Sequence, residues 1–501
     1  MSLTKNVAAN YLGQGWRALM GLAFVPLYIR YLGIEAYGLI GMFAILQGWL
    51  ALLDMGMKPA LGREMARFTG GLHDTQYIRS LLRSIEIIGL IVAAVIALGV
   101  WAASGWLATD WLAPASLRPD VVASAVAVMG AVTALRFLED IYASAIIGLQ
   151  RQVLVNVVMS ILATVRGLGA VAVLIWVSRT IEAFFLWQAL ISVITVALFA
   201  LVIYRTLPRL SEHAHFSWPA LRGIWRFSAG MMAITFLVLL LTQSDKILLS
   251  RLLSLKAFGY YALAGVVANA LFMLGAPVTT AFYPRFTELI ARGDEPALRA
   301  AYHQAAQLVG VLMGAAAIVL MVFGDRVLLL WTGDAALSRE VSPLLRVLAL
   351  GTLLNGLMWI PYHMQLAYGW TTLTIRINVV AVLLLVPTII LVVPTYGALG
   401  AAWGWVALNA GYLLFAIYFM HRRVLPHEKW QWYRQDVGIP IAAAASTAII
   451  CRWLFPRDLG RLGELGFLLA SSACVLIVAA ASAPTLRHQL GRYIPARPRS
   501  A

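Results

Sequence analysis

Three arginines lie inside apolar runs long enough to cross a bilayer: Arg17, Arg136 and Arg166. An arginine at the bilayer centre costs about 2.5 to 3.5 kcal/mol on insertion scales, so each one needs a partner, water or a function. A guanidinium can donate two parallel hydrogen bonds to a phosphate or carboxylate, so these side chains could bind an anionic group. Arg17 and Arg166 have no acidic residue within four positions, which favours a functional role for both.

The first apolar run carries a polar stripe. Asn10, Gln14 and Arg17 follow i, i+4 and i+7 spacing, which places them on one narrow face of a helix. A face of this kind should not meet lipid. We expect it to line a cavity.

A second polar stripe is expected on a continuous second helix, which carries Gln47, Asp54 and Lys58 at i, i+7 and i+11. Lys58 lies toward the expected cytoplasmic end of the second helix. Lys246 lies near the expected periplasmic end of the seventh helix and is its counterpart at the outer membrane surface. Together with the arginines, the two lysines would place cations at several depths of the membrane. Both lysines could instead extend their charged ends to the membrane surface.

Four carboxylates accompany these cations and allow two interpretations: Asp54, Asp245, Glu139 and Asp140. Intramembrane carboxylates can couple transport to protons or cations, because their charge changes on binding. They can also simply neutralise nearby cations. The spacing favours neutralisation for Asp54 and Asp245, while Arg136, with acids at i+3 and i+4, is balanced between a structural and a binding role.

The composition requires a membrane. The chain has 501 residues, of which 61% are hydrophobic and 12% charged, against about 25% charged in soluble domains. We count about fourteen apolar runs of about 20 residues. Continuous apolar stretches such as 379–386 favour helices over a β-barrel. We therefore predict an all-α integral membrane protein with spans that begin near residues 9, 37, 78, 121, 153, 181, 225, 257, 302, 341, 371, 396, 437 and 463.

The distribution of positive charge predicts the orientation. Cytoplasmic N- and C-termini would place roughly 22 of the 38 Lys and Arg residues in cytoplasmic loops and flanks. The net charge of +16 follows from this topology, and no nucleic-acid-binding motif accompanies it. Neither a metal-ligand cluster nor a phosphate-binding GK[ST] loop occurs, so we predict no catalytic residues, no metal and no cofactor.

An internal repeat suggests two related halves. YIRYLGIEAYG at residues 28–38 recurs as LSRLLSLKAFG at residues 249–259, with Arg30 matching Arg251 and Gly38 matching Gly259. This offset corresponds to six helices, an even number, so both copies would enter the membrane in the same direction. The substrate would then bind between the halves. A chance likeness of two apolar segments remains the alternative.

The segments 24–43 and 242–264 resemble the ends of the first and seventh helices of Wzx-type O-antigen flippases. These belong to the multidrug/oligosaccharidyl-lipid/polysaccharide (MOP) exporter superfamily. The resemblance implies two six-helix bundles around a V-shaped, MATE-like cavity, here residues 1–210 and 211–425, with two further helices and a basic tail in 426–501. It also implies an undecaprenyl-diphosphate-linked oligosaccharide as substrate and a bacterial inner membrane. A polysaccharide polymerase and a chain-length regulator are candidate partners, which the sequence leaves open.

The sequence leaves two other functions open. A drug exporter of the same superfamily would carry organic cations and favour an acidic, aromatic lining, whereas the charges near mid-membrane are mainly positive. A membrane enzyme of polysaccharide assembly would need an exposed catalytic apparatus, and every connecting loop is short. The sequence thus favours a flippase that works by alternating access, with a diphosphate headgroup contacting the cations in turn.

Overall fold

The computed structural model describes residues 3–112, 114, 116–208, 214–368, 370, 372–456 and 459–487. These residues form helices and contain no strand, which confirms the predicted all-α class. Ten segments among them are long and apolar enough to cross a membrane. The total of fourteen spans stays a prediction.

The chain packs as two compact units, unit 1 (Met1–Gly259) and unit 2 (Tyr260–Ala501). The division lies later than the predicted boundary at residue 210, because α9 (Trp218–Leu252) packs on helices of unit 1. The two predicted six-helix bundles were defined by the repeat in the sequence, whereas this division is defined by packing. The bundles therefore stay a prediction.

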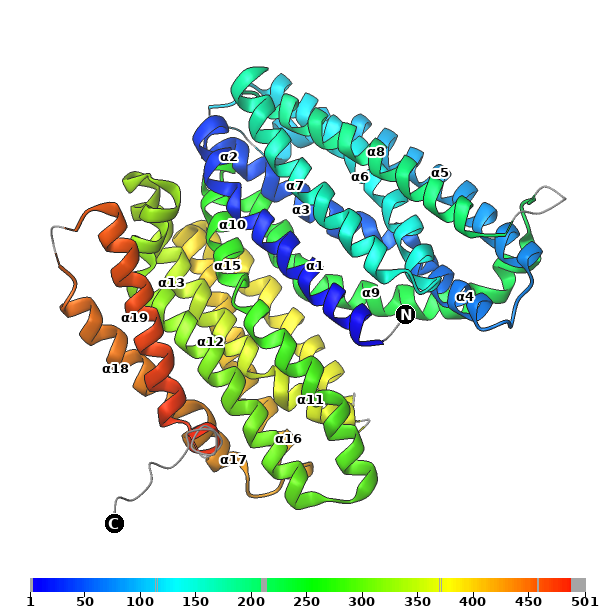
Figure 1. Cartoon of the computed structure of the whole chain (residues 1–501). Coiled ribbons are helices and arrows are strands. Elements are labelled where there is room, and N and C mark those ends of the chain that lie inside the picture. Colours follow the sequence, from blue (N-terminus) through cyan, green and yellow to red (C-terminus); the bar gives the residue numbers. More distant parts are fainter. Residues whose placement is uncertain are drawn as a thin grey trace, which may run out of the picture. The chain divides into compact units, whose positions relative to one another are not determined.

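Unit 1 has α6 at its centre, packed against α4, α5 and α8, and Figure 1 shows α5, α6 and α8 side by side. Its helices, besides α9, are α1 (Leu3–Ala23), α2 (Val25–Leu32), α3 (Ile34–Leu50), α4 (Met57–Thr69), α5 (Thr75–Trp106), α6 (Pro119–Gly148), α7 (Gln152–Trp176), α8 (Ile181–Thr206) and the first residues of α10 (Leu255–Asn269). Short 3-10 and π-helical turns, Ala51–Asp54 and Leu107–Trp111, follow α3 and α5.

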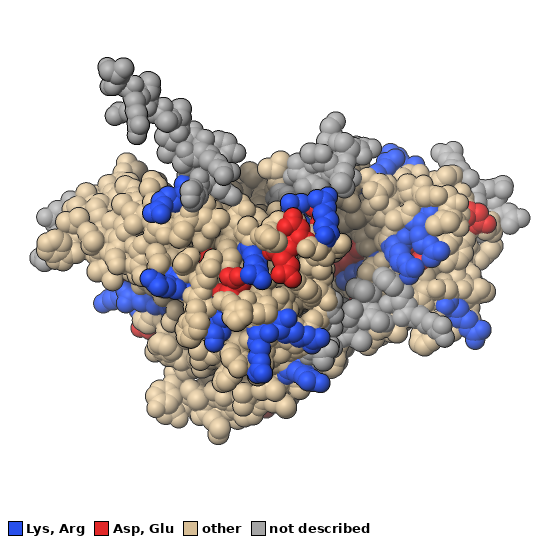
Figure 2. All heavy atoms as spheres, turned by 90° about the horizontal axis from the view of Figure 1, so that it is seen from below, with Lys and Arg blue, Asp and Glu red and all other residues tan. Residues whose placement is uncertain are grey.

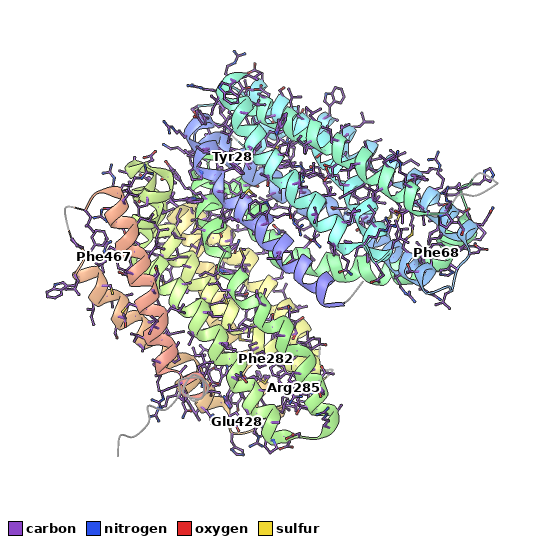
Figure 3. The ribbon with its side chains drawn as sticks, viewed as in Figure 1. Tyr28, Phe68, Phe282, Arg285, Glu428 and Phe467 are labelled. Atoms are coloured by element: carbon purple, nitrogen blue, oxygen red, sulfur yellow. The ribbon has the colours of Figure 1, made fainter. Side chains whose placement is uncertain are left out.

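Two apolar clusters occupy the two ends of unit 1. The first contains buried residues 122–132 of α6 with parts of α3 and α8, and the second contains residues 134–146 of α6 with α4 and α5. Tyr28 packs on the first cluster and Phe68 on the second, and Figure 3 shows them at opposite ends of the unit. Positions 133–140 of α6 therefore lie where the clusters meet.

The expected continuous second helix is wrong. α3 ends at Leu50, and α4 begins at Met57. Met55 (φ 47°) and Gly56 (φ 71°) adopt left-handed backbone conformations that end the helical hydrogen bonding. Asp54 Oδ1 accepts a 2.7 Å hydrogen bond from the Gly56 amide, and a Cβ at Gly56 would overlap the backbone of Ser228 in α9. This break turns α4, and with it Lys58, into a new direction.

The two glycines matched by the repeat make a reciprocal contact inside unit 1. A Cβ on Gly38 would lie 2.5 Å from the carbonyl oxygen of Leu255, and a Cβ on Gly259 would lie 2.5 Å from that of Ile34. Ile34 and Leu255 are themselves matched positions of the repeat. Two segments related by a two-fold axis make contacts of this kind, in which i meets j′ and j meets i′. The contact supports a genuine repeat.

We expect Gly38→Ala and Gly259→Ala each to lower the stability of the purified protein by about 1 to 3 kcal/mol, because the added Cβ meets backbone that cannot rotate away. Similar losses in the two variants would reflect the reciprocal geometry. Thermal unfolding followed by tryptophan fluorescence measures this effect. Gly99→Ala is the matched control, since its Cβ would enter open space. Unchanged unfolding in both repeat variants would contradict the close approach.

Unit 2 is organised around α12, which packs against α11, α13, α18 and α19. Its helices are α11 (Phe272–Arg292), α12 (Glu295–Thr332), α13 (Ala335–Leu357), α14 (Trp359–Ala367), α15 (Thr372–Gly411), α16 (Ile417–Arg423), α17 (Lys429–Gln431), α18 (Ile439–Trp453) and α19 (Arg461–Ser482). π-helical turns, η3 (Tyr412–Ala416) and η4 (Trp432–Gly438), precede α16 and α18. α15 is broken at Gly397 (φ 58°, ψ −148°), so it comprises two helical rods.

Candidate functional site

Five charged residues form a layer where the two apolar clusters of unit 1 meet. We call them the charged layer: Lys58 on α4, Arg136, Glu139 and Asp140 on α6, and Arg166 on α7. Each lies within an α-helix. Rigid helices can hold charged groups in fixed positions for a ligand more accurately than loops can.

Arg136 is held by neutral groups. Its Nη1 donates to Gln47 Oε1 (3.0 Å) and its Nη2 to Gln188 Oε1 (3.2 Å), while the guanidinium lies 5.0 Å from the centre of the Phe43 ring. The acids at i+3 and i+4 do not pair with it, since Glu139 pairs with Arg166 and Asp140 with Lys58. Its Nε is buried without a hydrogen-bond partner among the described residues. The positive charge of Arg136 thus remains uncompensated by direct contact.

Arg166 is neutralised. Its Nη2 lies 2.5 Å from Glu139 Oε1 on α6, and Ser192 and Thr195 of α8 supply further oxygens at 3.2 and 3.4 Å. The side chains of Arg166 and Glu139 are 17% and 3% exposed. The sequence showed no acid near Arg166 because its partner is 27 residues away in the chain. A buried pair of this kind makes a structural role for Arg166 the simpler interpretation.

Lys58 contacts two carboxylates. Its Nζ lies 3.1 Å from Asp140 Oδ2 and 3.9 Å from Asp54 Oδ2, and 4.9 Å from the centre of the Phe137 ring. The Lys58 side chain is 14% exposed, whereas that of Asp140 is 56% exposed. Asp54 therefore lies beside Lys58, as its spacing suggested, but Asp140 is the nearer partner.

A small cavity of about 50 Å³ opens onto the charged layer. Two cations, one carboxylate and two uncharged polar side chains line it together with apolar residues: Gln47, Leu50, Lys58, Ile96, Thr133, Arg136, Phe137 and Asp140. Its volume admits water-sized groups in this conformation. Gln47 and Lys58, which the sequence placed on one stripe, do line the same cavity despite the break between α3 and α4.

The stripe on α1 lies apart from this cavity. Arg17 Nη1 donates to Asn156 Oδ1 of α7 at 3.2 Å, and no ion pair among the described side chains includes Arg17. Gln14 is exposed on unit 1. The side chain of Asn10 lies outside the described residues. Arg17 is therefore a second cation without a described counterion, partly buried against α7.

Lys246 on α9 is separate from the charged layer. Its Nζ donates to Gln243 Oε1 on the same helix at 3.2 Å, the one hydrogen bond described for this lysine. The side chain of Asp245 lies outside the described residues, so its pairing with Lys246 stays a prediction. The structure thus brings together Lys58, Arg136, Arg166 and three carboxylates, and leaves Arg17 and Lys246 at other places.

Sequence reasoning missed Gln188 and Phe43, which hold Arg136. An amide within the apolar run of α8 was the available signal for Gln188, because a buried amide needs a hydrogen-bond partner. Phe43 gave no signal, since aromatic residues are frequent in this chain.

A buried polar cluster in unit 2 was also missed. His303 of α12 lies between two carboxylates, with Nδ1 at 2.5 Å from Asp436 Oδ2 and Nε2 at 3.1 Å from Glu428 Oε2. Gln307 donates to Asp436 at 2.9 Å. Burial raises the pKa of Asp436, which lies in η4 outside the candidate spans, and hydrogen bonds from His303 and Gln307 act in the opposite direction. This cluster ties α12 to the segment that leads into α18.

No group of three or more His, Cys, Asp or Glu side chains suited to a metal ion occurs among the residues that the structure describes. Glu428 lies at the same end of unit 2 as Arg285 (Figure 3). The charged layer and this cluster are thus polar features of different units.

Comparisons with known proteins agree on the family. Residues 3–290 match the family described as polysaccharide biosynthesis protein, and residues 231–391 match the MatE family. A Shigella flexneri protein that carries the provisional description of O-antigen transporter is 20% identical over 405 residues, which are 81% of this chain and 94% of that protein.

Solved structures share the fold at low sequence identity. The lipid II flippase MurJ in an inward closed conformation has a TM-score of 0.69 at 11% identity, and the match covers 98% of this chain and all of that one. An inward-facing multidrug resistance MATE family transporter of the MOP superfamily has a TM-score of 0.64 at 16% identity, over 81% of this chain and 94% of that one.

These relatives are described as transporters and flippases, and none of the three as an enzyme. The matched family segment covers more than half of the sequence. The protein therefore belongs to the polysaccharide biosynthesis protein family, and its long apolar helices make it a multi-pass membrane protein.

Proposed function

We propose that the protein is a flippase that moves a polyprenyl-diphosphate-linked oligosaccharide from the cytoplasmic to the outer leaflet of a bacterial inner membrane by alternating access. The family, the O-antigen transporter relative and the MurJ fold support a lipid-linked glycan as substrate. The lipid tail stays in the bilayer while the charged and sugar-bearing headgroup crosses through protein. No covalent step is needed.

Arg136 is the observation that carries this proposal. It is a partly buried guanidinium that lines a cavity, has neutral partners, and keeps its buried Nε–H without a described hydrogen bond. A phosphate oxygen would supply both the missing acceptor and the missing negative charge. Hydrogen bonds to charged groups contribute about 1.5 to 3 kcal/mol each, so such a group binds phosphate strongly where water is excluded.

Lys58 is available to the same headgroup if it exchanges partners. Its nearer carboxylate, Asp140, is more than half exposed and can turn away, while Asp54 lies at the longer distance of 3.9 Å. A phosphate could therefore displace Asp140. Protonation or cation binding at Asp140 or Asp54 would have the same effect on Lys58, and this makes both carboxylates candidates for ion coupling. Glu139 is less suited, since it is 3% exposed and paired with Arg166.

The cavity is too small for a diphosphate in this conformation, at about 50 Å³. Alternating access provides the remaining space, since a cavity closed in one state opens in the other. A ligand shifts such an equilibrium only by its difference in affinity between the two states. Arg136 would therefore have to bind the phosphate more tightly in one of the two conformations than in the other.

The orientation with both termini in the cytoplasm remains part of the proposal. Figure 2 shows one face of the molecule on which Lys and Arg side chains outnumber Asp and Glu. Arg285 and Glu428 lie at the lower end of unit 2 in Figure 3, the direction from which Figure 2 is seen. An excess of Lys and Arg favours a cytoplasmic location. A polysaccharide polymerase and a chain-length regulator would be the protein partners.

A drug or cation exporter is the second candidate, and the MatE match over residues 231–391 favours it. Such a protein would need a carboxylate free to bind its cation. In unit 1 the described carboxylates of the site, Asp54, Glu139 and Asp140, pair with Lys58 or Arg166, and the charged group of the site without an ion-pair partner is the cation Arg136. This arrangement favours the anionic substrate.

The deciding experiment reconstitutes the purified protein into proteoliposomes and measures translocation of a fluorescent polyprenyl-diphosphate oligosaccharide. We expect a rate well above that of empty vesicles, and no transport of a fluorescent organic cation driven by a pH or sodium gradient. Export of the cation without movement of the sugar lipid would replace the flippase with the exporter.

A further inference from the structure

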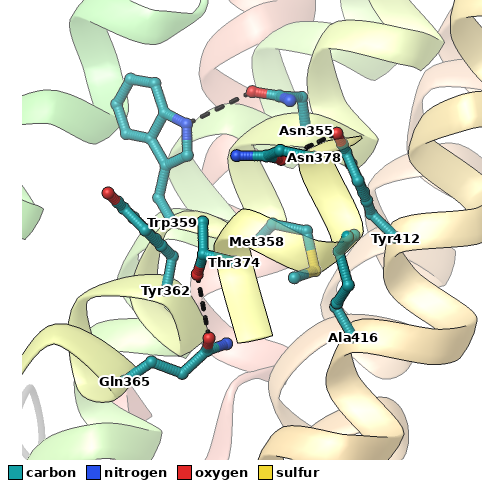
Figure 4. A pocket seen from close by; sticks show the side chains of 10 residues that line it. Asn355, Met358, Trp359, Tyr362, Gln365, Thr374, Asn378, Tyr412 and Ala416 are labelled. Atoms are coloured by element: carbon teal, nitrogen blue, oxygen red, sulfur yellow. Dashed lines mark hydrogen bonds between the residues drawn. The ribbon is translucent and has the colours of Figure 1, made fainter. Parts of the chain in front are cut away.

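A second cavity of about 220 Å³ lies wholly within unit 2. The end of α13, α14, the first turns of α15 and η3 enclose it, as Figure 4 shows. Ten residues line it, and none of them is charged. The polar ones are amides and hydroxyls, and the apolar surface is largely aromatic. This cavity differs in chemistry from the charged layer of unit 1.

Aromatic rings and amides surround the space. Figure 4 shows Trp359 and Tyr362 on one side and Tyr412 on the other, with the Asn378 amide between them. Gln365 forms part of the wall below. Flat rings contact the apolar C–H faces of a pyranose, and an amide offers both donors and an acceptor to sugar hydroxyls.

The lining is held in place by its own hydrogen bonds. Tyr412 donates to Asn378 Oδ1 at 3.0 Å, and Thr374 donates to Gln365 Oε1 at 3.1 Å. Behind Trp359, the Phe272 ring stacks with centroids 4.9 Å apart. A rigid lining loses little freedom when a ligand binds. The cavity is thus preformed.

Two polar groups of the lining remain unused. The described structure gives neither the amide nitrogen of Asn378 nor the hydroxyl of Tyr362 a hydrogen-bond partner. An apolar ligand would leave these groups unpaired, which is costly. An organic cation would find no carboxylate and a phosphate no cation among the lining residues. A neutral, hydroxyl-rich ligand would hydrogen-bond both the Asn378 amide nitrogen and the Tyr362 hydroxyl.

We infer that this pocket binds one neutral sugar ring of the glycan headgroup, with Asn378 and Tyr362 bonding its hydroxyls and Trp359 packing on its face. The inference rests on the proposed function for the source of the sugar. Drug-sized ligands occupy pockets of about 300 to 1,000 Å³. The smaller volume of 220 Å³ therefore selects a single ring and not a whole repeat unit.

This site would give the protein its glycan preference. Sites that hydrogen-bond a particular hydroxyl reject analogues that lack it far more strongly than apolar pockets reject a missing methylene. The unit-2 pocket would therefore discriminate among glycans that share the same lipid diphosphate. The charged layer, which would contact only the phosphate groups, would not discriminate among these glycans.

The test measures equilibrium binding of two kinds of probe to the detergent-purified full chain. One is a polyprenyl diphosphate that carries a single neutral sugar, taken in turn as glucose, galactose, mannose or N-acetylglucosamine. The other is the same lipid diphosphate without sugar. We expect wild type to bind at least one sugar-bearing lipid about tenfold or more tightly than the sugar-free lipid.

Asn378→Leu should abolish this sugar-dependent gain and leave the affinity for the sugar-free lipid unchanged. Tyr412→Phe is the milder variant, because it removes only the hydroxyl that positions Asn378. Trp403→Ala is the control, since this tryptophan is 52% exposed and does not line the pocket. A wild type that binds none of the sugar-bearing lipids more tightly overturns the inference. An Asn378→Leu variant that keeps the sugar-dependent gain also overturns it. The same holds for a variant that binds both probes more weakly by the same factor.

Binding and translocation separate the two proposals. If wild type shows the sugar-dependent gain but moves no lipid in vesicles, the flippase function is wrong and the sugar pocket stands. If it moves the lipid without any such gain, the flippase function stands and the pocket is wrong.

Discussion

Arg136→Gln should reduce translocation of the lipid-diphosphate oligosaccharide by about 10- to 150-fold in proteoliposomes. The glutamine removes the charge, and because the partners of Arg136 are neutral amides, no buried charge is left unpaired and the helices should remain packed. The lost hydrogen bonds to phosphate are worth about 1.5 to 3 kcal/mol, and about 1.4 kcal/mol corresponds to a tenfold change in rate. The measurement is the initial rate at equal amounts of inserted protein.

Arg136→Lys should retain part of the activity, since it keeps the charge but loses the paired donors of the guanidinium. Arg118→Gln is the matched control, because this arginine precedes the same helix, α6, and its side chain is 78% exposed. Wild-type rates in Arg136→Gln would remove the anion site from unit 1. Arg17→Gln belongs in the same series, as another partly buried arginine without a described counterion.

Glu139→Gln should destabilise the protein by about 3 to 5 kcal/mol, the cost typical of removing one partner from a buried ion pair. Arg166, whose side chain is 17% exposed, would then have only uncharged oxygens nearby, those of the new amide and of the Ser192 and Thr195 hydroxyls. Arg166→Met should cost a similar amount, because it leaves Glu139 buried without a counterion. Thermal and denaturant unfolding in detergent, followed by tryptophan fluorescence, provides the comparison.

The double variant Glu139→Gln/Arg166→Met decides between pairing and independent roles. We expect it to be more stable than either single variant, because no unpaired charge remains. A coupling energy of about 0.5 to 3 kcal/mol is typical of residues in direct contact. Strictly additive losses would mean that the pair observed here does not stabilise the fold, and would return Arg166 to the list of phosphate-binding candidates.

Hydropathy in the sequence predicted the all-α membrane class, because apolar runs of about 20 residues can be satisfied only as helices in lipid. The repeat at residues 28–38 and 249–259 was also visible in the sequence, and the reciprocal approach of Gly38 and Gly259 agrees with it. The sequence could not show the break before α4. The left-handed backbone at Met55 and Gly56 ends the helix, and Gly56 lies against the backbone of Ser228 in α9 at this turn.

The sequence by itself determined that Arg136 lies inside a long apolar helix, since no polar run or loop signal interrupts residues 121–138 around it. The tertiary structure decided which cations are neutralised. Arg136 meets Gln47, which is 89 residues away, and Arg166 meets Glu139, which is 27 residues away. Helical spacing reports only neighbours three or four positions apart. Pairing between helices depends on how they pack, so the role of each arginine could be read only from the folded chain.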